Sequence, residues 1–203
     1  MPLFAKPQRP RLSFDSRPAA IYAIGDVHGC LDQLGALGAQ IVADAAGIDG
    51  EKWLVTLGGY VDRGPQPAAV IARVMGPAPP GFRRFALIGN HEQLLLDFLA
   101  NPPAHLEWLE WGGLYTAAAY GMPDDPGQGW RRRPQAFAEA LRPRIPARHL
   151  ELLAGLPTVL ALPKFLFVHA GIRPGVPLAA QEDEDLIWIR APFLNATGSS
   201  ELT

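Results

Sequence analysis

Three short apolar runs in this chain each end at a glycine that opens a polar turn, and a helical pattern follows each turn. In an open α/β sheet the carboxyl ends of the strands line one crevice. We therefore expect the three turns to bring carboxylate, imidazole, amide and guanidinium groups into one pocket. The runs and their turns are residues 21–24 with Gly-Asp-Val-His-Gly (25–29), residues 53–57 with Gly-Gly-Tyr-Val-Asp-Arg-Gly (58–64), and residues 85–88 with Gly-Asn-His-Glu (89–92).

Length and composition favour a single domain with one core. The chain has 203 residues, 48% of them hydrophobic, and a mean hydropathy of +0.05. A net charge of −2 and a pI of 6.2 give no global reason to expect a nucleic-acid polymer or an anionic membrane as partner. The single cysteine, Cys30, favours a reducing compartment, so we expect a cytoplasmic protein. The composition does not indicate an oligomeric state.

Proline content and helical pattern divide the chain into an arm, a domain and a tail. Residues 1–19 carry four prolines among basic residues and are interpreted as a flexible arm without the apolar segment of a signal peptide. Residues 20–194 form the predicted domain and residues 195–203 a polar tail. Within the domain, residues 101–156 show short helical patterns and no strand pattern, which predicts a helical insertion or cap. No apolar run is long enough to span a bilayer.

Four polar residues at predicted strand ends are of types that bind metal ions. Asp26, His28 and Asn90 lie in the first and third turns, and His169 follows a predicted hairpin of residues 158–168. A dinuclear site for phosphate chemistry takes oxygen and imidazole ligands from several strand ends, and this mixture suits manganese, iron or zinc. The other histidines and the cysteine are assigned structural roles: His105, His149 and Cys30.

The turns resemble the signature set of a known enzyme family. The segments GDVHG, GGYVDRG, GNHE and HAG occur in the order found in the phosphoprotein phosphatase (serine/threonine phosphatase-like) family of calcineurin-like metallophosphoesterases. Residues 186–193, LIWIRAPF, further resemble its small bacterial members, and symmetrical diadenosine tetraphosphatases share most of these motifs. The resemblance implies an α/β fold built as a β-sandwich flanked by helices. It also implies two divalent metal ions and hydrolysis of phosphate monoesters by metal-bound hydroxide.

The resemblance also implies roles for individual residues. Asp26 and His28 would hold the first metal ion, and Asn90 and His169 would bind the second. His91 would be the general acid that protonates the leaving oxygen. The remaining catalytic and substrate-binding roles fall to Asp62, which would orient the acid, and to Arg63 and Arg190, which would bind phosphate oxygens.

Two departures from the family pattern bear on the metal site. The family sequence at the second turn is GDxxDRG, and its first aspartate bridges both ions, whereas this chain has Gly59. The family also supplies a further histidine from a GHT motif downstream of LIWIR, and the chain ends at Thr203 without one. We therefore expect an incomplete C-terminal part, at best one well-bound ion, and impaired activity.

Several functions stay open on the sequence alone. The leading one is a metal-dependent phosphoesterase, with protein phosphoserine or phosphothreonine, a small phosphoester and a dinucleoside polyphosphate all open as substrates. The alternative is a catalytically inactive phosphate- or phosphoprotein-binding pseudophosphatase that keeps Arg63, His91 and Arg190. A nucleotide-binding α/β domain is disfavoured, because no glycine-rich phosphate fingerprint follows the first strand.

The basic run Arg131-Arg132-Arg133 has two interpretations. Exposed charge runs are usually only solvated, and we expect that here. If the insertion covers the crevice, these arginines would instead select substrates with more than one phosphate.

Overall fold

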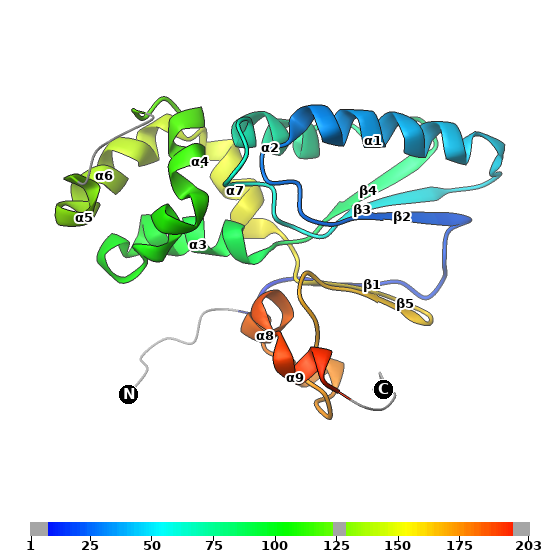
Figure 1. The fold of residues 1–203 in the computed structure, drawn as a ribbon. Helices are drawn as coiled ribbons and strands as arrows, with labels where there is room; N and C mark the ends of the chain where they lie inside the picture. The colour runs from blue at the N-terminus through cyan, green and yellow to red at the C-terminus, as the bar shows by residue number, and fades with distance from the viewer. Residues whose placement is uncertain (1–7, 124–128, 197–203) are drawn as a thin grey trace.

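Two three-stranded sheets stacked face to face form the centre of the fold (Figure 1). The computed structural model describes residues 8–123 and 129–196. The first sheet has the order β2-β3-β4 with all strands parallel. The second has the order β1-β5-β6, with β1 parallel and β6 antiparallel to β5. The strands are β1 (Arg11–Ser13), β2 (Ala20–Ile24), β3 (Lys52–Thr56), β4 (Phe82–Ala86), β5 (Val159–Leu162) and β6 (Phe165–Phe167).

Helical crossovers make the first sheet parallel, because a parallel pair needs a long connection between its strands. Helices α1 (Leu31–Asp44) and α2 (Pro67–Met75) provide these connections and lie together over the outer face of the sheet (Figure 1). The strands pair without stagger, so that Ile24 lies opposite Thr56 and Thr56 opposite Ala86. The three polar turns therefore leave the sheet at the same edge.

Apolar residues from both sheets meet in the space between them. In β3, Trp53 and Val55 point into this layer, while Leu54 packs on the helical side, as the two-residue period of a strand requires. The layer also contains Phe85 of β4 and Leu160 of β5. The predicted β-sandwich flanked by helices is therefore confirmed.

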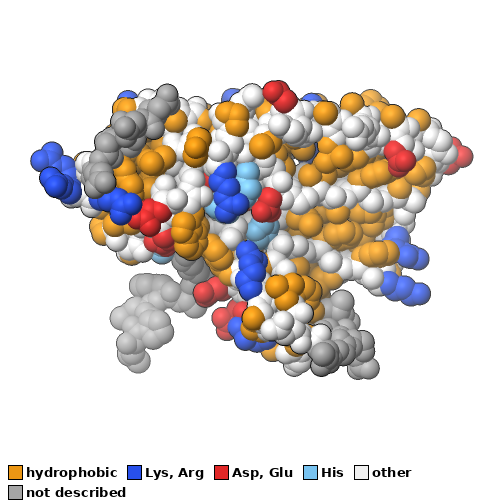
Figure 2. All heavy atoms as spheres, viewed as in Figure 1, with side chains coloured by type: hydrophobic (Ala, Val, Ile, Leu, Met, Phe, Trp, Pro, Cys, Tyr) orange, Lys and Arg blue, Asp and Glu red, His pale blue; other side chains and the backbone are white. Residues whose placement is uncertain are grey.

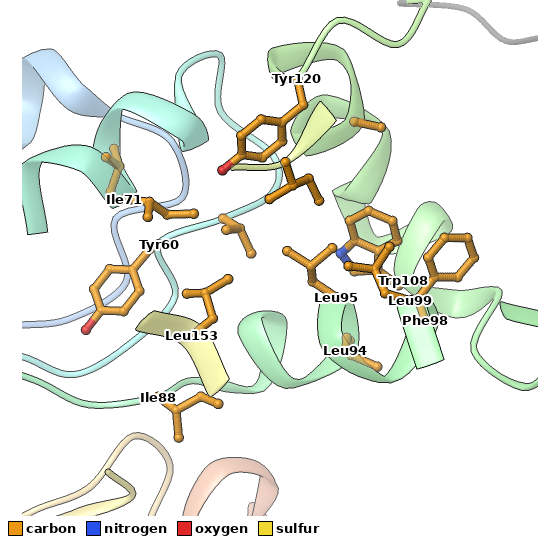
Figure 3. Packing of buried hydrophobic residues seen from close by; sticks show 14 of the residues in the cluster. Tyr60, Ile71, Ile88, Leu94, Leu95, Phe98, Leu99, Trp108, Tyr120 and Leu153 are labelled. Atoms are coloured by element: carbon orange, nitrogen blue, oxygen red, sulfur yellow. The ribbon is translucent and has the colours of Figure 1, made fainter. Parts of the chain in front are cut away.

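Residues 102–123 and 129–155 contain the helical elements that follow α3 (Asn90–Ala100). Phe98 of α3 packs against Trp108 with ring centroids 4.8 Å apart, and both are fully buried (Figure 3). Across the described ranges 8–123 and 129–196, no helix is both long and apolar enough to cross a membrane. The elements are η2 (Pro102–Ala104), the π-helical η3 (Leu109–Gly113), α4 (Leu114–Ala119), α5 (Gly129–Arg132), α6 (Pro134–Leu141), η4 (Arg142–Arg144) and α7 (Ala147–Gly155).

The arm predicted at residues 1–19 contacts the rest of the domain over its described part. β1 pairs with β5, and Arg9 reaches the end of α7, where its Nη1 donates to the carbonyls of Leu153, Ala154 and Leu156 at 3.0–3.2 Å. An arginine in this position satisfies carbonyls that the helix end leaves unpaired. The segment is therefore ordered by contacts with residues more than 140 positions away in sequence.

The remaining elements connect the layers and close the described chain. They are η1 (Ala45–Gly47), η5 (Leu178–Ala180), α8 (Asp183–Trp188) and α9 (Ala191–Leu194). Of the predicted arm and polar tail, residues 1–7 and 197–203 lie outside the described residues.

Candidate active site

Backbone hydrogen bonds tie the turn after β2 to the turn after β3. The carbonyl of Gly59 accepts the N–H groups of Val27 at 2.9 Å and His28 at 2.7 Å. His28, Asp62 and Arg63 have φ values of 43°, 70° and 66°. A non-glycine residue in this left-handed region costs about 1–2 kcal/mol, so the surrounding contacts must hold these turns in place. Strained residues of this kind concentrate at functional sites.

Glu92 joins the second turn to the third through a fully buried carboxylate. Its Oε1 accepts the N–H groups of Tyr60 at 2.7 Å and Val61 at 3.1 Å. Its Oε2 accepts those of Gly59 at 2.8 Å and Gly89 at 2.9 Å. Glu92 is not among the residues predicted to be functional, although a glutamate at the third position of a helix is a recognised capping signal. That signal predicts the bond to Gly89 but not the three bonds to the other turn.

Asp26 and His28 face each other at the mouth of the crevice. His28 Nε2 lies 3.4 Å from Asp26 Oδ2, and the Asp26 side chain is half exposed. The contact with His28 lowers the pKa of Asp26 below its usual value, against the opposing effect of burial. Burial lowers the pKa of His28, but Asp26 and the Val61 carbonyl outweigh burial, and its pKa is raised overall. The pair therefore favours a negative carboxylate beside an imidazole that attracts a proton.

His169 and Asn90 complete the cluster from the opposite side. His169 Nδ1 donates to the Leu57 carbonyl at 2.8 Å, which leaves Nε2 as an acceptor in the neutral ring, and this Nε2 lies 3.1 Å from Asn90 Oδ1. Asp26 Oδ1 is 3.7 Å from His169 Nδ1, and the rings of His28 and His91 are 4.6 Å apart. The structure thus brings Asp26, His28, Asn90, His91 and His169 into one cluster of side chains. Figure 2 shows such basic, acidic and histidine side chains gathered at the middle of one face.

The chemistry of these donors fits one cation. His28 Nδ1 bonds the Val61 carbonyl at 2.7 Å, so its Nε2 carries the lone pair in the neutral ring, yet that atom is buried without a hydrogen-bond partner. His169 Nε2 and Asn90 Oδ1 are both acceptor atoms, and they face each other as two ligands of one positive ion would. A bridged pair of ions fits less well, because Gly59 has no side chain. Within residues 8–123 and 129–196, no three His, Cys, Asp or Glu side chains are grouped as a metal site.

His91 lies between a buried carboxylate and an exposed guanidinium. Its Nδ1 is 2.7 Å from Asp62 Oδ2, and its Nε2 is 3.0 Å from Arg63 Nη2. Arginine can only donate, so Nε2 accepts and Nδ1 carries the proton. Asp62 is fully buried and His91 nearly so, whereas Arg63 is exposed. The Asp62–His91 pair is therefore held in place by burial, and the Arg63 guanidinium is accessible to a ligand.

The other predicted arginines lie outside this cluster of contacts. Arg190 is exposed before α9, and it lines a hollow of about 630 Å³ together with Trp188 and Arg173. In the basic run, Arg131 Nη1 pairs with Glu110 at 2.8 Å and its guanidinium lies over Trp130. All three arginines of the run are exposed, which favours the solvated interpretation.

Gly59 is the position where this turn departs most from the expected ligand set. Its φ is +67°, and a Cβ added here would lie 2.7 Å from Asp26 Oδ1 and 3.1 Å from Asp26 Cα. Gly59→Asp must therefore displace Asp26 and place two carboxylates together. Without metal, we expect the variant to unfold at a lower temperature than the parent, at a cost of about 1–2 kcal/mol from the left-handed backbone alone.

A divalent cation would remove the repulsion between these two carboxylates. We expect manganese to raise the unfolding temperature of Gly59→Asp more than that of the parent, as measured by thermal unfolding in EDTA and in MnCl₂. Gly59→Asn is the matched control, with the same size and strain but no added charge. Equal responses of the parent and Gly59→Asp to manganese would show that position 59 does not reach the ion.

Sequence comparisons match this chain to one family model and to two named proteins. The family model described as "Calcineurin-like phosphoesterase" matches residues 19–192. A protein named "Bis(5'-nucleosyl)-tetraphosphatase, symmetrical" from Hamiltonella defensa subsp. Acyrthosiphon pisum (strain 5AT) is 40% identical over 98 residues, which cover 43% of this chain and 31% of that protein. A protein of the same name from Nitrosococcus oceani (strain ATCC 19707 / BCRC 17464 / JCM 30415 / NCIMB 11848 / C-107) is 39% identical over 87 residues, which cover 42% and 29%. The aligned regions thus span less than a third of either relative's length.

A solved structure shows the same fold. The crystal structure of a protein provisionally described as a diadenosine tetraphosphatase superposes with a TM-score of 0.57 at 20% identity, over 88% of this chain and 62% of that one.

Proposed function

Because this chain belongs to the calcineurin-like phosphoesterase family, we propose that it hydrolyses phosphate esters in the crevice at the carboxyl ends of β2, β3 and β4. The observation that carries the proposal is the buried Asp62–His91 pair, whose outer nitrogen lies 3.0 Å from the exposed Arg63 guanidinium. Hydrolysis of a phosphate ester needs a cation for the phosphate oxygens and an acid for the leaving oxygen. Both groups lie within one hydrogen bond of each other here.

Arg63 and His91 exchange partners when a phosphate enters. The guanidinium fork suits two phosphate oxygens, so Arg63 turns from His91 Nε2 toward the phosphate. Nε2 is then free to take up a proton from solvent and to pass it to the leaving oxygen as a water oxygen bonds to phosphorus, the ester P–O bond breaks and the attacking water releases a proton to solvent. Asp62 accepts from Nδ1 throughout and stabilises the charged ring that forms between these two events. Arg190 is a second candidate for phosphate binding, since it lies exposed at the edge of the neighbouring hollow.

A divalent ion would be held by Asp26, His28, Asn90 and His169. Manganese, iron and zinc suit these mixed oxygen and imidazole donors. When bound, such an ion supplies Lewis-acid polarisation of a phosphoryl oxygen. We propose one well-held ion and reduced activity, because Gly59 offers no bridging carboxylate.

A small phosphoester related to dinucleoside polyphosphates is the substrate class that we favour over phosphoproteins. The named relatives are symmetrical bis(5'-nucleosyl)-tetraphosphatases. The exposed Trp111, at 47% exposure, is the chain neighbour of Gly112, whose carbonyl accepts the Arg63 N–H at 3.3 Å. Trp111 lies 5.8 Å from Trp188, ring centroid to ring centroid. Such rings can stack on a nucleobase.

The test is release of phosphate by metal-free and manganese-loaded protein. We expect manganese-dependent hydrolysis of diadenosine tetraphosphate and of an aryl phosphate, with slower release from a phosphoserine peptide. Asp26→Asn should remove most of the manganese response, whereas Asp32→Asn, a change on the first turn of α1, should not. Binding of inorganic phosphate without any turnover would instead support the inactive phosphate-binding protein.

A further inference from the structure

The helical insertion reaches into the buried acid–base pair. Asp62 is fully buried, and besides His91 it has two side-chain donors, both from residues 102–155. Thr116 Oγ1 donates to Asp62 Oδ1 at 2.7 Å. Trp108 Nε1 lies 3.1 Å from both Oδ1 and Oδ2. Trp108 and Thr116 follow Asp62 by 46 and 54 residues in the sequence.

The directions of these hydrogen bonds are determined. Thr116 Oγ1 accepts the backbone N–H of Asp62 at 2.8 Å, so its own hydrogen is directed to Oδ1. The indole N–H of Trp108 can only donate. Both carboxylate oxygens are therefore held as acceptors, and His91 can meet Asp62 only by donating from Nδ1. That arrangement leaves His91 Nε2 facing Arg63 and the crevice.

Local backbone geometry places both residues against Asp62. The segment η3, which is kinked at Gly112, separates Trp108 from Thr116. Gly112 within η3 has a φ of 115°, and its carbonyl also binds the Arg63 backbone. Gly113 packs so closely on the Trp108 ring that a Cβ would overlap it. Trp108 is held on its other side by Phe98 (Figure 3).

We infer that Trp108 and Thr116 are positioning residues, through which the helical insertion fixes Asp62 and thereby holds His91 with its proton on Nδ1. The insertion then forms part of the catalytic apparatus, in addition to covering the core. The expected effect on hydrolysis rates rests on the proposed function, whereas the expected hydrogen bonding of the His91 ring does not.

Thr116→Val removes one donor while keeping the shape of the side chain, and Trp108→Phe removes the other donor together with part of the buried ring. If they act through the general acid, they should slow hydrolysis of an alkyl phosphate, whose leaving oxygen needs a proton, by about 10-fold, part of the 10²–10⁴ that such an acid supplies. Hydrolysis of p-nitrophenyl phosphate, whose leaving group needs little help, should change less than about 3-fold, with KM unchanged in both cases. Thr116→Ser, which keeps the hydroxyl, should restore the alkyl phosphate rate.

Two matched controls separate this effect from loss of buried side chains in general. Thr158→Val removes a fully buried hydroxyl that donates to Asp183 at 3.1 Å, and Trp130→Phe changes another buried tryptophan of the insertion. Neither control should alter the ratio of the two rates. Equal slowing of both substrates by Thr116→Val, or no rescue by Thr116→Ser, would overturn the inference.

A second measurement works without substrate or metal. Nitrogen-15 and proton NMR of the His91 ring should show a strongly hydrogen-bonded, slowly exchanging Nδ1–H in the parent and in Thr116→Ser, and a faster-exchanging Nδ1–H in Thr116→Val, because Asp62 is then held by one donor fewer. An unchanged ring in Thr116→Val would overturn the inference even if the protein is active. If the parent hydrolyses nothing, the proposed function fails, and the ring measurement alone decides the role of Thr116.

Discussion

Glu92→Leu is expected to lower the free energy of unfolding of the metal-free protein by about 3–5 kcal/mol, the range for removing one partner from a buried charged network. Leucine fills a similar volume but accepts no hydrogen bond, so four backbone N–H groups of the two turns would be left buried and unpaired. Domains of this size are stabilised by only about 5–15 kcal/mol in total, so the loss is a large fraction. Urea denaturation followed by circular dichroism measures it.

A graded series makes the Glu92 prediction specific. Glu92→Gln keeps one accepting oxygen and should lose less than Glu92→Leu, because its amide nitrogen repels only part of the donors. Glu151→Leu on α7 replaces an exposed glutamate and should change stability by no more than about 0.5 kcal/mol. If Glu92→Leu unfolds at the same urea concentration as Glu151→Leu, the carboxylate does not hold the turns together.

His91→Gln is expected to slow hydrolysis of alkyl phosphates by about 10²–10⁴-fold, the contribution of a positioned general acid. Glutamine can hydrogen-bond to Asp62 but cannot deliver a proton at neutral pH. Inhibition by inorganic phosphate should stay within a few-fold of the parent, because Arg63 is retained. Steady-state kinetics with phosphate as inhibitor separates the two effects.

The control for His91→Gln is the same change at another histidine. His105 in the insertion lies 3.3 Å from Glu107 and makes no contact with the crevice residues described above, so His105→Gln should keep the parent rate. Asp62→Asn should also slow the reaction, since an amide nitrogen placed among three donors forces a change in at least one of them. A rate for His91→Gln within 3-fold of the parent would remove His91 from its role as the acid.

Local patterns in the sequence were sufficient to predict the convergence of the turns, whereas the β-sandwich was predicted from the resemblance to a known family. Each turn follows an apolar strand and begins with glycine, and parallel strands in register bring their ends together, so Asp26 and Asn90 could be placed in one crevice before any coordinates. The first sheet needed no long-range information, because every strand is followed by its own helix. His169 required only the further assumption that its hairpin packs on that sheet.

Contacts between distant segments could not be predicted in this way. The ordering of residues 8–19 depends on Arg9 reaching carbonyls at the end of α7, and no periodicity in the arm signals it. Trp108 and Thr116 look like ordinary residues of a helical segment, since apolar and small polar side chains are common there. Only the folded path of η3 shows that both of them point at Asp62. The exposure of Arg190 likewise depends on where α9 begins.

The turn at Gly59 is held by main-chain atoms at both ends, through its carbonyl to Val27 and His28 and through its N–H to Glu92. The side chain at this position therefore contributes nothing to the scaffold. A carboxylate can be introduced here by one substitution, and the neighbour that must move first is Asp26. The fold of this region and its metal occupancy therefore depend on different atoms. A chain can keep the backbone of a phosphoesterase while its affinity for metal changes.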